Sequence, residues 1–318
     1  MHIIDAKGIP LWNRATFEEM RAGGLTAVNL VCSIWEDFDA SMRSMARLKQ
    51  CVRDNGDLAY IVRTADDFDA PENLNRTGII LGWQNASGFD DYLPFVDVCA
   101  ELGLRIVQPA FLTANSAGSG CYESLDRGLT DFGGELVARL NRCGIAIDIA
   151  HLGRETARQV VRASSKPVFY AQSAPRALKD NVRNKSDADM RLVAEHGGVV
   201  AVAALPHYLP SGTESTVEDM GRAIAYVIDV VGEDAVAIGS DLTPDQPPAF
   251  YQYVSHDKGS GRRLIDYSVA PTLPGMQRFS DYPRLIQVLE RAGHAAGRIE
   301  KIMGGNLQRY FGQAWTAA

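Results

Sequence analysis

The sequence lacks the features that mark several classes of protein. Its five cysteines are scattered and odd in number, with no Cys-x-x-Cys pair, which is typical of reduced thiols. The net charge is −7, and the sequence contains no cluster of lysine and arginine. Both features argue against a nucleic-acid partner. No apolar run approaches the roughly 18 residues of a membrane helix, and no basic, apolar leader opens the chain. We therefore expect a cytoplasmic protein with no membrane partner.

The chain does contain a regular alternation of strand-like and helix-like segments. Its 318 residues, 46% of them hydrophobic, suffice for one large core. Such alternation predicts a single α/β domain over residues 1–318, a distorted TIM-type (β/α)8 barrel with a parallel sheet. A doubly wound sheet competes, but no glycine-rich phosphate loop follows an early strand. The predicted strands are residues 2–5, 25–32, 58–62, 78–83, 104–110, 144–151, 167–170, 199–205 and 235–239, one more than a barrel holds.

Two long segments do not follow this alternation. Residues 113–127 are rich in glycine and serine and form a candidate pocket loop. At about 243–280, proline, glycine, tyrosine and charge dominate, which predicts an irregular excursion over the mouth of the barrel. The end of the chain, residues 282–311, has helical patterns.

Polar residues stand at the carboxyl ends of the predicted strands. His151 ends a continuous apolar run, and Lys7, Gln84, Gln172 and Asp241 hold similar places. Because all such ends face the same way in a parallel barrel, these side chains should converge at one mouth, where barrels bind ligands. By itself, a strand-end histidine is as often a hydrogen-bonded core residue as a functional one.

A series of short motifs points to a known family. In chain order they are Leu129-Thr130-Asp131-Phe132-Gly133, Leu140-Asn141-Arg142-Cys143-Gly144, Asp148-Ile149-Ala150-His151, Arg183-Asn184-Lys185, Gly197-Gly198-Val199, Ile238-Gly239-Ser240-Asp241 and Gly304-Gly305-Asn306. With these motifs the chain resembles the membrane (renal) dipeptidase family of zinc peptidases, and its soluble bacterial members above all. The resemblance implies a metallo-dependent-hydrolase-like barrel with two zinc ions that hydrolyses dipeptides and related small amides.

The same resemblance shows that most zinc ligands are replaced. The family's first-strand Asp-Gly-His-x-Asp pattern corresponds to Asp5-Ala6-Lys7-Gly8-Ile9, and its bridging glutamate falls at about Gln84 or Asn85. The second of its later histidines is Gln172, so His151 and Asp241 remain. A protonated Lys7 would repel a cation, which predicts no two-zinc site. One zinc ion on His151 and Asp241, joined by His207 or by Glu123 and Asp126, stays open, as does the absence of any metal.

The resemblance also implies roles for the remaining residues. Arg183 matches the arginine that binds the substrate carboxylate, and Asp241 matches the residue that handles the proton of the attacking water. The residues expected to contact substrate are Arg183, Gln84, Asn85, Gln172 and His207.

Three functions follow from these roles. The first is a dipeptidase-like amidohydrolase with at most one metal ion, acting on a small carboxylate-bearing amide. The second is a metal-independent enzyme with acid–base chemistry on Lys7, His151 and Asp241, where Lys7 could also be a mere buried salt bridge. The third is a non-catalytic small-molecule binder. A homo-oligomer is left open.

Overall fold

All nine predicted strands form in the computed structural model, which describes residues 1–267 and 272–316. They are β1 (Ile4–Gly8), β2 (Ala27–Ser33), β3 (Ala59–Ile61), β4 (Thr77–Trp83), β5 (Leu104–Val107), β6 (Ala146–Ile147), β7 (Phe169–Ser173), β8 (Val199–Val202) and β9 (Val236–Ile238). Several strands are shorter than their apolar runs, and β6 ends four residues before His151. The predicted ranges 243–280 and 1–318 include residues 268–271 and 317–318, which lie outside the described residues.

The strands form two parallel sheets that join into a barrel. One sheet has the order β1-β2-β4-β5-β6, and the other has the order β7-β8-β9. Single parallel bridges connect the sheets, from Asp148 to Phe169 at one seam and from Gly8 to Leu242 at the other. Strand β3 pairs only with the first half of β4, and β5 pairs with the second half. The ninth strand, which the barrel cannot hold, is therefore β3.

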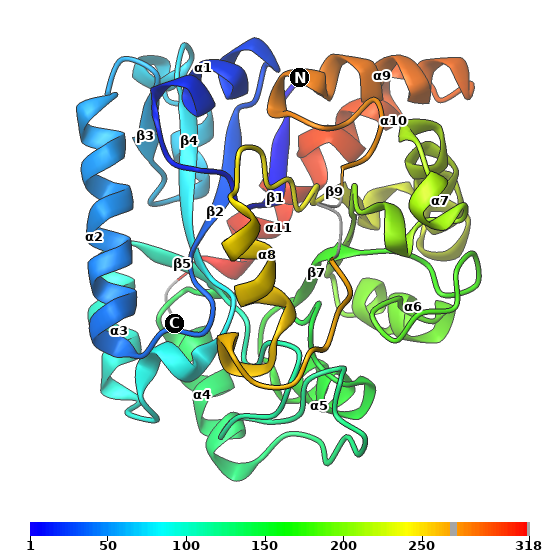
Figure 1. Cartoon of the computed structure of the whole chain (residues 1–318). Coiled ribbons are helices and arrows are strands. Elements are labelled where there is room, and N and C mark those ends of the chain that lie inside the picture. The colour runs from blue at the N-terminus through cyan, green and yellow to red at the C-terminus, as the bar shows by residue number, and fades with distance from the viewer. Residues whose placement is uncertain (268–271, 317–318) are drawn as a thin grey trace.

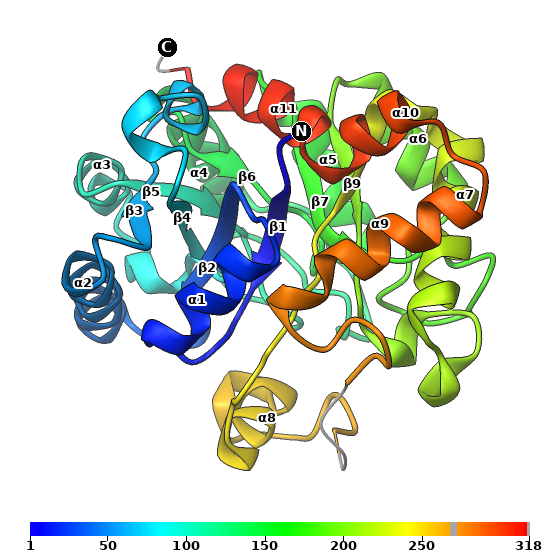
Figure 2. The ribbon, with the colours of Figure 1, turned by 90° about the horizontal axis from the view of Figure 1, so that it is seen from above.

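Amphipathic helices surround these strands, as Figures 1 and 2 show. Their apolar faces cover the outer surface of the sheet, and polar side chains begin several of them, such as Thr130 before α4. The helices are α1 (Arg14–Ala22), α2 (Phe38–Asp54), α3 (Pro94–Glu101), α4 (Asp131–Arg142), α5 (Arg154–Ala163), α6 (Asp187–Glu195), α7 (Val217–Val231), α8 (Pro248–Ser255), α9 (Tyr282–Arg291), α10 (Ala296–Glu300) and α11 (Asn306–Ala314).

Helix α11 fills the amino-terminal end of the barrel. Its Leu307, Tyr310 and Phe311 belong to the same buried cluster as the small and apolar residues that begin the strands, and Tyr310 packs on Phe169 with ring centroids 4.7 Å apart. The opposite end, where the strands finish, is therefore the end left for a ligand.

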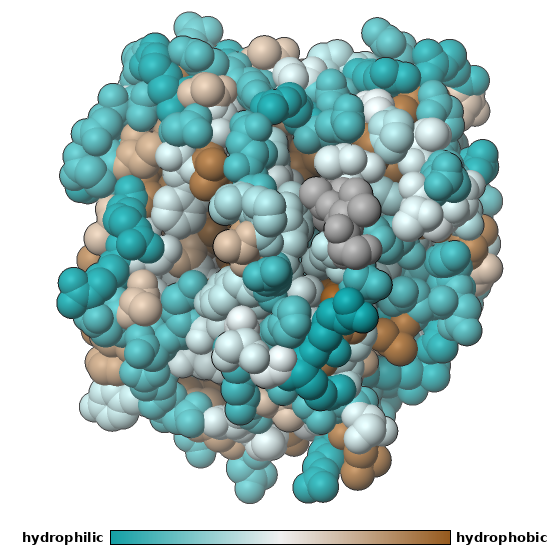
Figure 3. Space-filling view, in the orientation of Figure 1, coloured by the Kyte–Doolittle hydropathy of each residue, from teal (hydrophilic) through white to brown (hydrophobic). Residues whose placement is uncertain are grey.

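The predicted excursion after β9 contains a helix that the sequence pattern did not indicate. Helix α8 stands apart from the ring of helices in Figure 2 and lies in front of the barrel in Figure 1. The face that carries α8 is mostly hydrophilic, with apolar residues scattered over it (Figure 3). Among helices of the described chain, none has both the length and the apolar character needed to cross a membrane.

A buried carboxyl group closes the seam between β9 and β1. Asp5 accepts hydrogen bonds from the backbone N–H of Ser240, at 2.8 Å, and from the Ser240 hydroxyl. Burial raises the pKa of Asp5 from 3.8 to about 6, although these hydrogen bonds oppose the shift. The folded protein therefore keeps this proton between pH 4 and 6, where the unfolded chain has lost it.

This seam predicts a loss of stability as the pH rises. The protonated carboxyl group of Asp5 contributes about 3 kcal/mol to the free energy of unfolding. This contribution is fully present below about pH 4 and is lost as the pH rises to about 6. We expect Asp5→Asn to flatten the dependence of the urea midpoint on pH between 4 and 7. A variant whose profile is as steep as that of the wild type would contradict this origin.

Candidate active site

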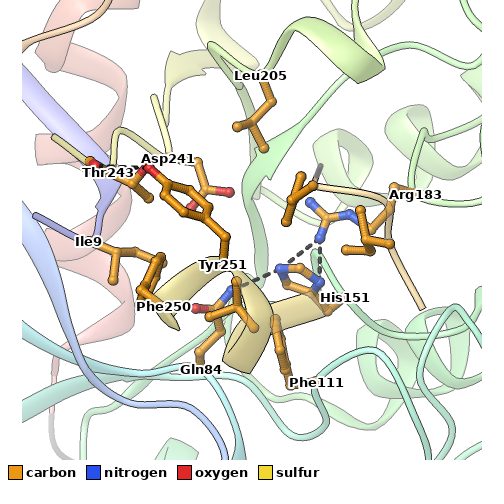
Figure 4. A pocket seen from close by; sticks show the side chains of 13 residues that line it. Ile9, Gln84, Phe111, His151, Arg183, Leu205, Asp241, Thr243, Phe250 and Tyr251 are labelled. Atoms are coloured by element: carbon orange, nitrogen blue, oxygen red, sulfur yellow. Dashed lines mark hydrogen bonds between the residues drawn. The ribbon is translucent and has the colours of Figure 1, made fainter. Parts of the chain in front are cut away.

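The polar residues at the strand ends gather at the carboxyl-terminal mouth of the barrel (Figure 4). Gln84 directly follows β4, Gln172 lies within β7, and Asp241 comes shortly after β9. His151 follows the short strand β6, and Arg183 comes from the loop between β7 and α6. Four of these residues, all except Gln172, line one cavity. The mouth of the barrel thus brings together residues that are far apart in the sequence.

His151 is surrounded by hydrogen-bond donors. The amide Nε2 atoms of Gln84 and Gln172 lie 2.9 and 2.8 Å from its ring Nε2, and Nη1 of Arg183 lies 2.6 Å from the same atom. Nη1 of Arg183 also contacts the ring Nδ1. Because a guanidinium nitrogen only donates, the ring nitrogen that it contacts is an acceptor and the imidazole is neutral. Burial, together with the charges of Arg183 and Lys7, holds the pKa of His151 well below its usual value.

Lys7 lies behind the wall of the cavity, inside the barrel. Its side chain is 1% exposed, and its Nζ lies 3.8 Å from Oδ2 of Asp148. Asp148 also accepts hydrogen bonds from the amide of Gln108 and from the backbone N–H groups of Ala150 and Ala171. Burial lowers the pKa of Lys7, and the charge of Asp148 opposes that shift. The ammonium group therefore belongs to a buried ion pair and not to the surface that a ligand touches.

Asp241 lines the cavity from a turn with an unusual backbone conformation. Its backbone has a φ of 58°, in the left-handed region that only a few residue types such as aspartate and asparagine tolerate. The backbone N–H donates to the carbonyl of Lys7 at 2.8 Å, which fixes the turn. Oδ1 is buried, and no group of the described chain hydrogen-bonds to it. Burial raises the pKa of Asp241, and the nearby charges of Lys7 and Arg183 act against this rise.

Arg183 is a buried cation without a carboxylate beside it. Its side chain is only 3% exposed, and its guanidinium carbon lies 5.2 Å from the ring centroid of Tyr208. Apart from His151 and this aromatic face, its guanidinium has no partner among the described residues, and Nε makes no hydrogen bond. Buried charges are ordinarily paired, so the position favours an anionic ligand.

The cavity itself is small and only partly enclosed, with a volume of about 40 Å³. Phe250, Tyr251 and Val254 of α8 line it, which makes α8 its cover. The ring of Phe111 packs edge-on against His151, with centroids 4.5 Å apart. Helix α8 therefore forms one side of the space that a ligand would occupy.

Three residues predicted to contact substrate, Asn85, Gln172 and His207, do not line this cavity. The side-chain oxygen of Asn85 accepts hydrogen bonds from the backbone N–H of Ser87 and from the side chain of Asn115. Asn85 thereby caps the turn Ala86–Phe89. His207 lies in the turn Pro206–Tyr208, with its ring 5.9 Å from that of Tyr267. The side chain of Gln172 does not line the cavity, and a hydrogen bond to His151 connects it to the site.

Several residues at the site were not singled out from the sequence. Asp148 lies inside the motif that ends in His151, and its charge within an apolar run was a signal for a buried partner such as Lys7. The amide of Gln108, which supports Asp148, carried no such signal. Tyr251 and Tyr267 come from the excursion, where no periodic pattern identified inward-facing positions.

The donor groups present do not fit a zinc pair. Within the described ranges, no three His, Cys, Asp or Glu side chains lie close enough together to hold a metal ion. The ring of His151 is already hydrogen-bonded to Gln84, Gln172 and Arg183, and the positive charge of Lys7 acts on Asp241. Glu123 and Asp126, considered as ligands for one ion, instead accept hydrogen bonds from the loop backbone and from the first turn of α5.

Comparison with known proteins gives a consistent family match. Residues 14–255 match the family described as membrane dipeptidase (peptidase family M19). The chain is 25% identical over 295 residues to an uncharacterized dipeptidase of Schizosaccharomyces pombe, which covers 89% of this chain and 63% of that protein. It is 26% identical to dipeptidase 3 of Rattus norvegicus over 80% of this chain and 48% of that protein. It thus spans about half to two thirds of the length of these curated relatives.

Solved structures agree with this match. An amidohydrolase from Pseudomonas aeruginosa is 40% identical, with a TM-score of 0.96, over 99% of this chain and 96% of that one. A metallo peptidase from Rhodobacter sphaeroides, liganded with a phosphinate mimic of the dipeptide L-Ala-D-Ala, has a TM-score of 0.82 at 18% identity, with 99% of each chain covered. At that identity, the second likeness shows the fold alone, which is a TIM-type barrel.

Proposed function

This chain belongs to the membrane dipeptidase family, peptidase family M19, and from that premise we propose that it hydrolyses a small, carboxylate-bearing amide of dipeptide size. We also propose that it does so without a pair of zinc ions. The family and the fold support a hydrolase, and the donor set around His151 supports the absence of the zinc pair.

The observation that carries this proposal is the set of unsatisfied groups around one cavity. Nε of Arg183, Oδ1 of Asp241 and Oε1 of Gln84 are all buried and have no partner in the described chain. Burying such groups costs free energy unless something pairs with them, so the cavity is built for a polar ligand. A guanidinium matches a carboxylate through two parallel hydrogen bonds, which assigns the carboxylate of the substrate to Arg183.

The remaining groups suffice for amide hydrolysis. In this proposal Asp241 accepts a proton from a water molecule while the water oxygen attacks the amide carbonyl carbon. The oxygen of the tetrahedral intermediate develops negative charge in the positive field of Lys7 and Arg183. Asp241 then returns the proton to the leaving nitrogen as the C–N bond breaks. Lys7 lies behind the wall of the cavity, so its charge stabilises the negative charge of the intermediate without a contact to the substrate.

Metal content and turnover test this proposal together. We expect protein purified without chelator to hold well below one equivalent of zinc after dialysis, because the replaced ligands cost a site at least about 10- to 100-fold in affinity each. Hydrolysis of N-acyl amino acids and dipeptides should then survive treatment with a chelator. Two retained equivalents would overturn the metal-free site, and one tightly held equivalent would favour a single-ion amidohydrolase. Ligand binding without any turnover would favour a non-catalytic binder.

A further inference from the structure

We propose that this cavity selects a substrate with net negative charge, an N-acyl amino acid with an apolar acyl group, over a zwitterionic dipeptide. The identification of the substrate as an amide to be hydrolysed rests on the proposed function above. The selection by charge does not, because it concerns binding alone.

The buried groups at the mouth of the barrel carry an excess of positive charge. Three cations, Lys7, Arg183 and Lys185, are buried close to two carboxylates, Asp148 and Asp241. His151, which they surround, is neutral. A proton that moves from Lys7 to Asp241 leaves this sum unchanged, so the excess does not depend on where that proton lies. One anionic group without a compensating cation is therefore the ligand that neutralises the site.

Neighbouring charges do not supply the missing anion. Asp189, which lies near Lys185, is already paired with Arg154 and Arg158, at 3.1 and 2.7 Å. Asp5, two residues before Lys7 in β1, is hydrogen-bonded to Ser240 at the seam between β1 and β9. The charges of Lys7, Arg183 and Lys185 do not shift the pKa of Asp5, so its carboxyl group is not their partner. The excess at the cavity therefore remains after the surrounding elements are counted.

An ammonium group on the ligand would have no suitable place. Arg183 and Asp241 are the only formally charged groups among the described residues of the cavity wall, since His151 is neutral. Asp241 already lies in the field of Lys7 and Arg183, so an ammonium brought to it would also meet two cations. The rest of the wall is mainly aliphatic and aromatic, from Ile9, Leu205, Phe250, Val254 and Ile265. An apolar acyl group suits that wall, whereas a buried ammonium there would lose its hydration without compensation.

A matched pair of ligands tests this selection. N-propionyl-leucine and glycyl-leucine have the same skeleton, and a methyl group in the first replaces the ammonium of the second. Near pH 6.5 the ammonium of the dipeptide, with a pKa of about 7.7–8.0, is protonated. We expect the acyl compound, in its better-bound enantiomer, to bind at least about tenfold more tightly in thermal-shift titrations. N-propionyl-leucinamide, which lacks the carboxylate, should not bind measurably.

Two variants test whether Arg183 is the anchor of the carboxylate. Arg183→Lys keeps the charge and loses the paired donors, so it should weaken the binding of N-propionyl-leucine by about tenfold. The matched control is Arg176→Lys in the same loop, where the side chain is half exposed and pairs with Asp180. This control should leave the affinity unchanged.

The outcomes separate this inference from the proposed function. Equal affinities, tighter binding of the dipeptide, or no binding of either ligand would overturn the selection by charge. An unchanged affinity in Arg183→Lys would overturn the role of Arg183 as anchor. Selective binding of the acyl compound without hydrolysis would leave the selection standing and refute the hydrolase proposal. Rapid hydrolysis of the dipeptide, together with tighter binding of the dipeptide than of the acyl compound, would support the hydrolase proposal and refute the selection by charge.

Discussion

Replacement of Asp241 by asparagine is expected to reduce the turnover number by about 10²- to 10⁴-fold, the usual range for loss of a general base. The change removes the proton acceptor and keeps the shape of the side chain. Asparagine also tolerates the φ of 58° at this position, so the turn after β9 should persist. The measurement is kcat and KM for whichever N-acyl amino acid or dipeptide the wild type hydrolyses, with the unfolding midpoint as a check of the fold.

A second aspartate in the same segment provides the control. Asp245 is exposed, also has a positive φ of 61°, and pairs with Arg278 at 2.8 Å outside the cavity. Asp245→Asn should leave kcat within about twofold of the wild type, because surface substitutions of this kind have small effects. If Asp241→Asn retained most of the turnover, the base would lie elsewhere in the cavity.

Replacement of Lys7 by methionine is expected to lower the free energy of unfolding by about 3–5 kcal/mol, the cost of leaving one member of a buried ion pair without its partner. Methionine has a similar length and is apolar, so it fills the same space without a cavity. The charge that remains belongs to Asp148, which is fully buried beside Gln108. Urea unfolding of both proteins at pH 7 measures the difference.

The double variant shows whether the pair itself is responsible. Lys7→Met combined with Asp148→Asn removes both charges, so it should recover part of the stability that Lys7→Met loses. A protein with Lys7→Met alone that is as stable as the wild type would show that Asp148 does not need this ammonium. In that case Lys7 would be free to act as an acid or base toward the ligand.

The barrel could be predicted from the sequence because its information is local. Each strand is a short apolar run bounded by glycine or polar residues, and each helix has an apolar face that a window of a few turns reveals. The sequence left open which run lies outside the barrel, because pairing decides that outcome, and it did not indicate helix α8. Whether 58–62 or another run lies outside the barrel depends on which edge of β4 is already occupied, and β5 competes with β3 for that edge.

The site could be predicted in part, for a different reason. His151, Gln84 and Asp241 stand where strands end, and parallel strands end at one mouth. Asn85 also follows a strand, but one further residue turns its side chain toward Ser87 and Asn115 and away from the cavity. The alternation of side chains along an extended backbone produces this difference, and the sequence pattern does not locate where β4 stops.

The sequence by itself determined that this chain is an α/β barrel, since this follows from residue types and their order. The resemblance to its family added the prediction that most zinc ligands are replaced. Only the tertiary structure decided how the residues at those positions are arranged. The Lys7 ammonium pairs with Asp148 behind the wall of the cavity. Arg183 lies against His151 and has no carboxylate partner among the residues that the structure describes. Helix α8, which no periodic pattern predicted, covers the cavity. These arrangements depend on contacts between residues far apart in the chain, 32 positions for Arg183 and His151 and 141 for Lys7 and Asp148. The energies of burial and charge that select them arise only when those residues meet.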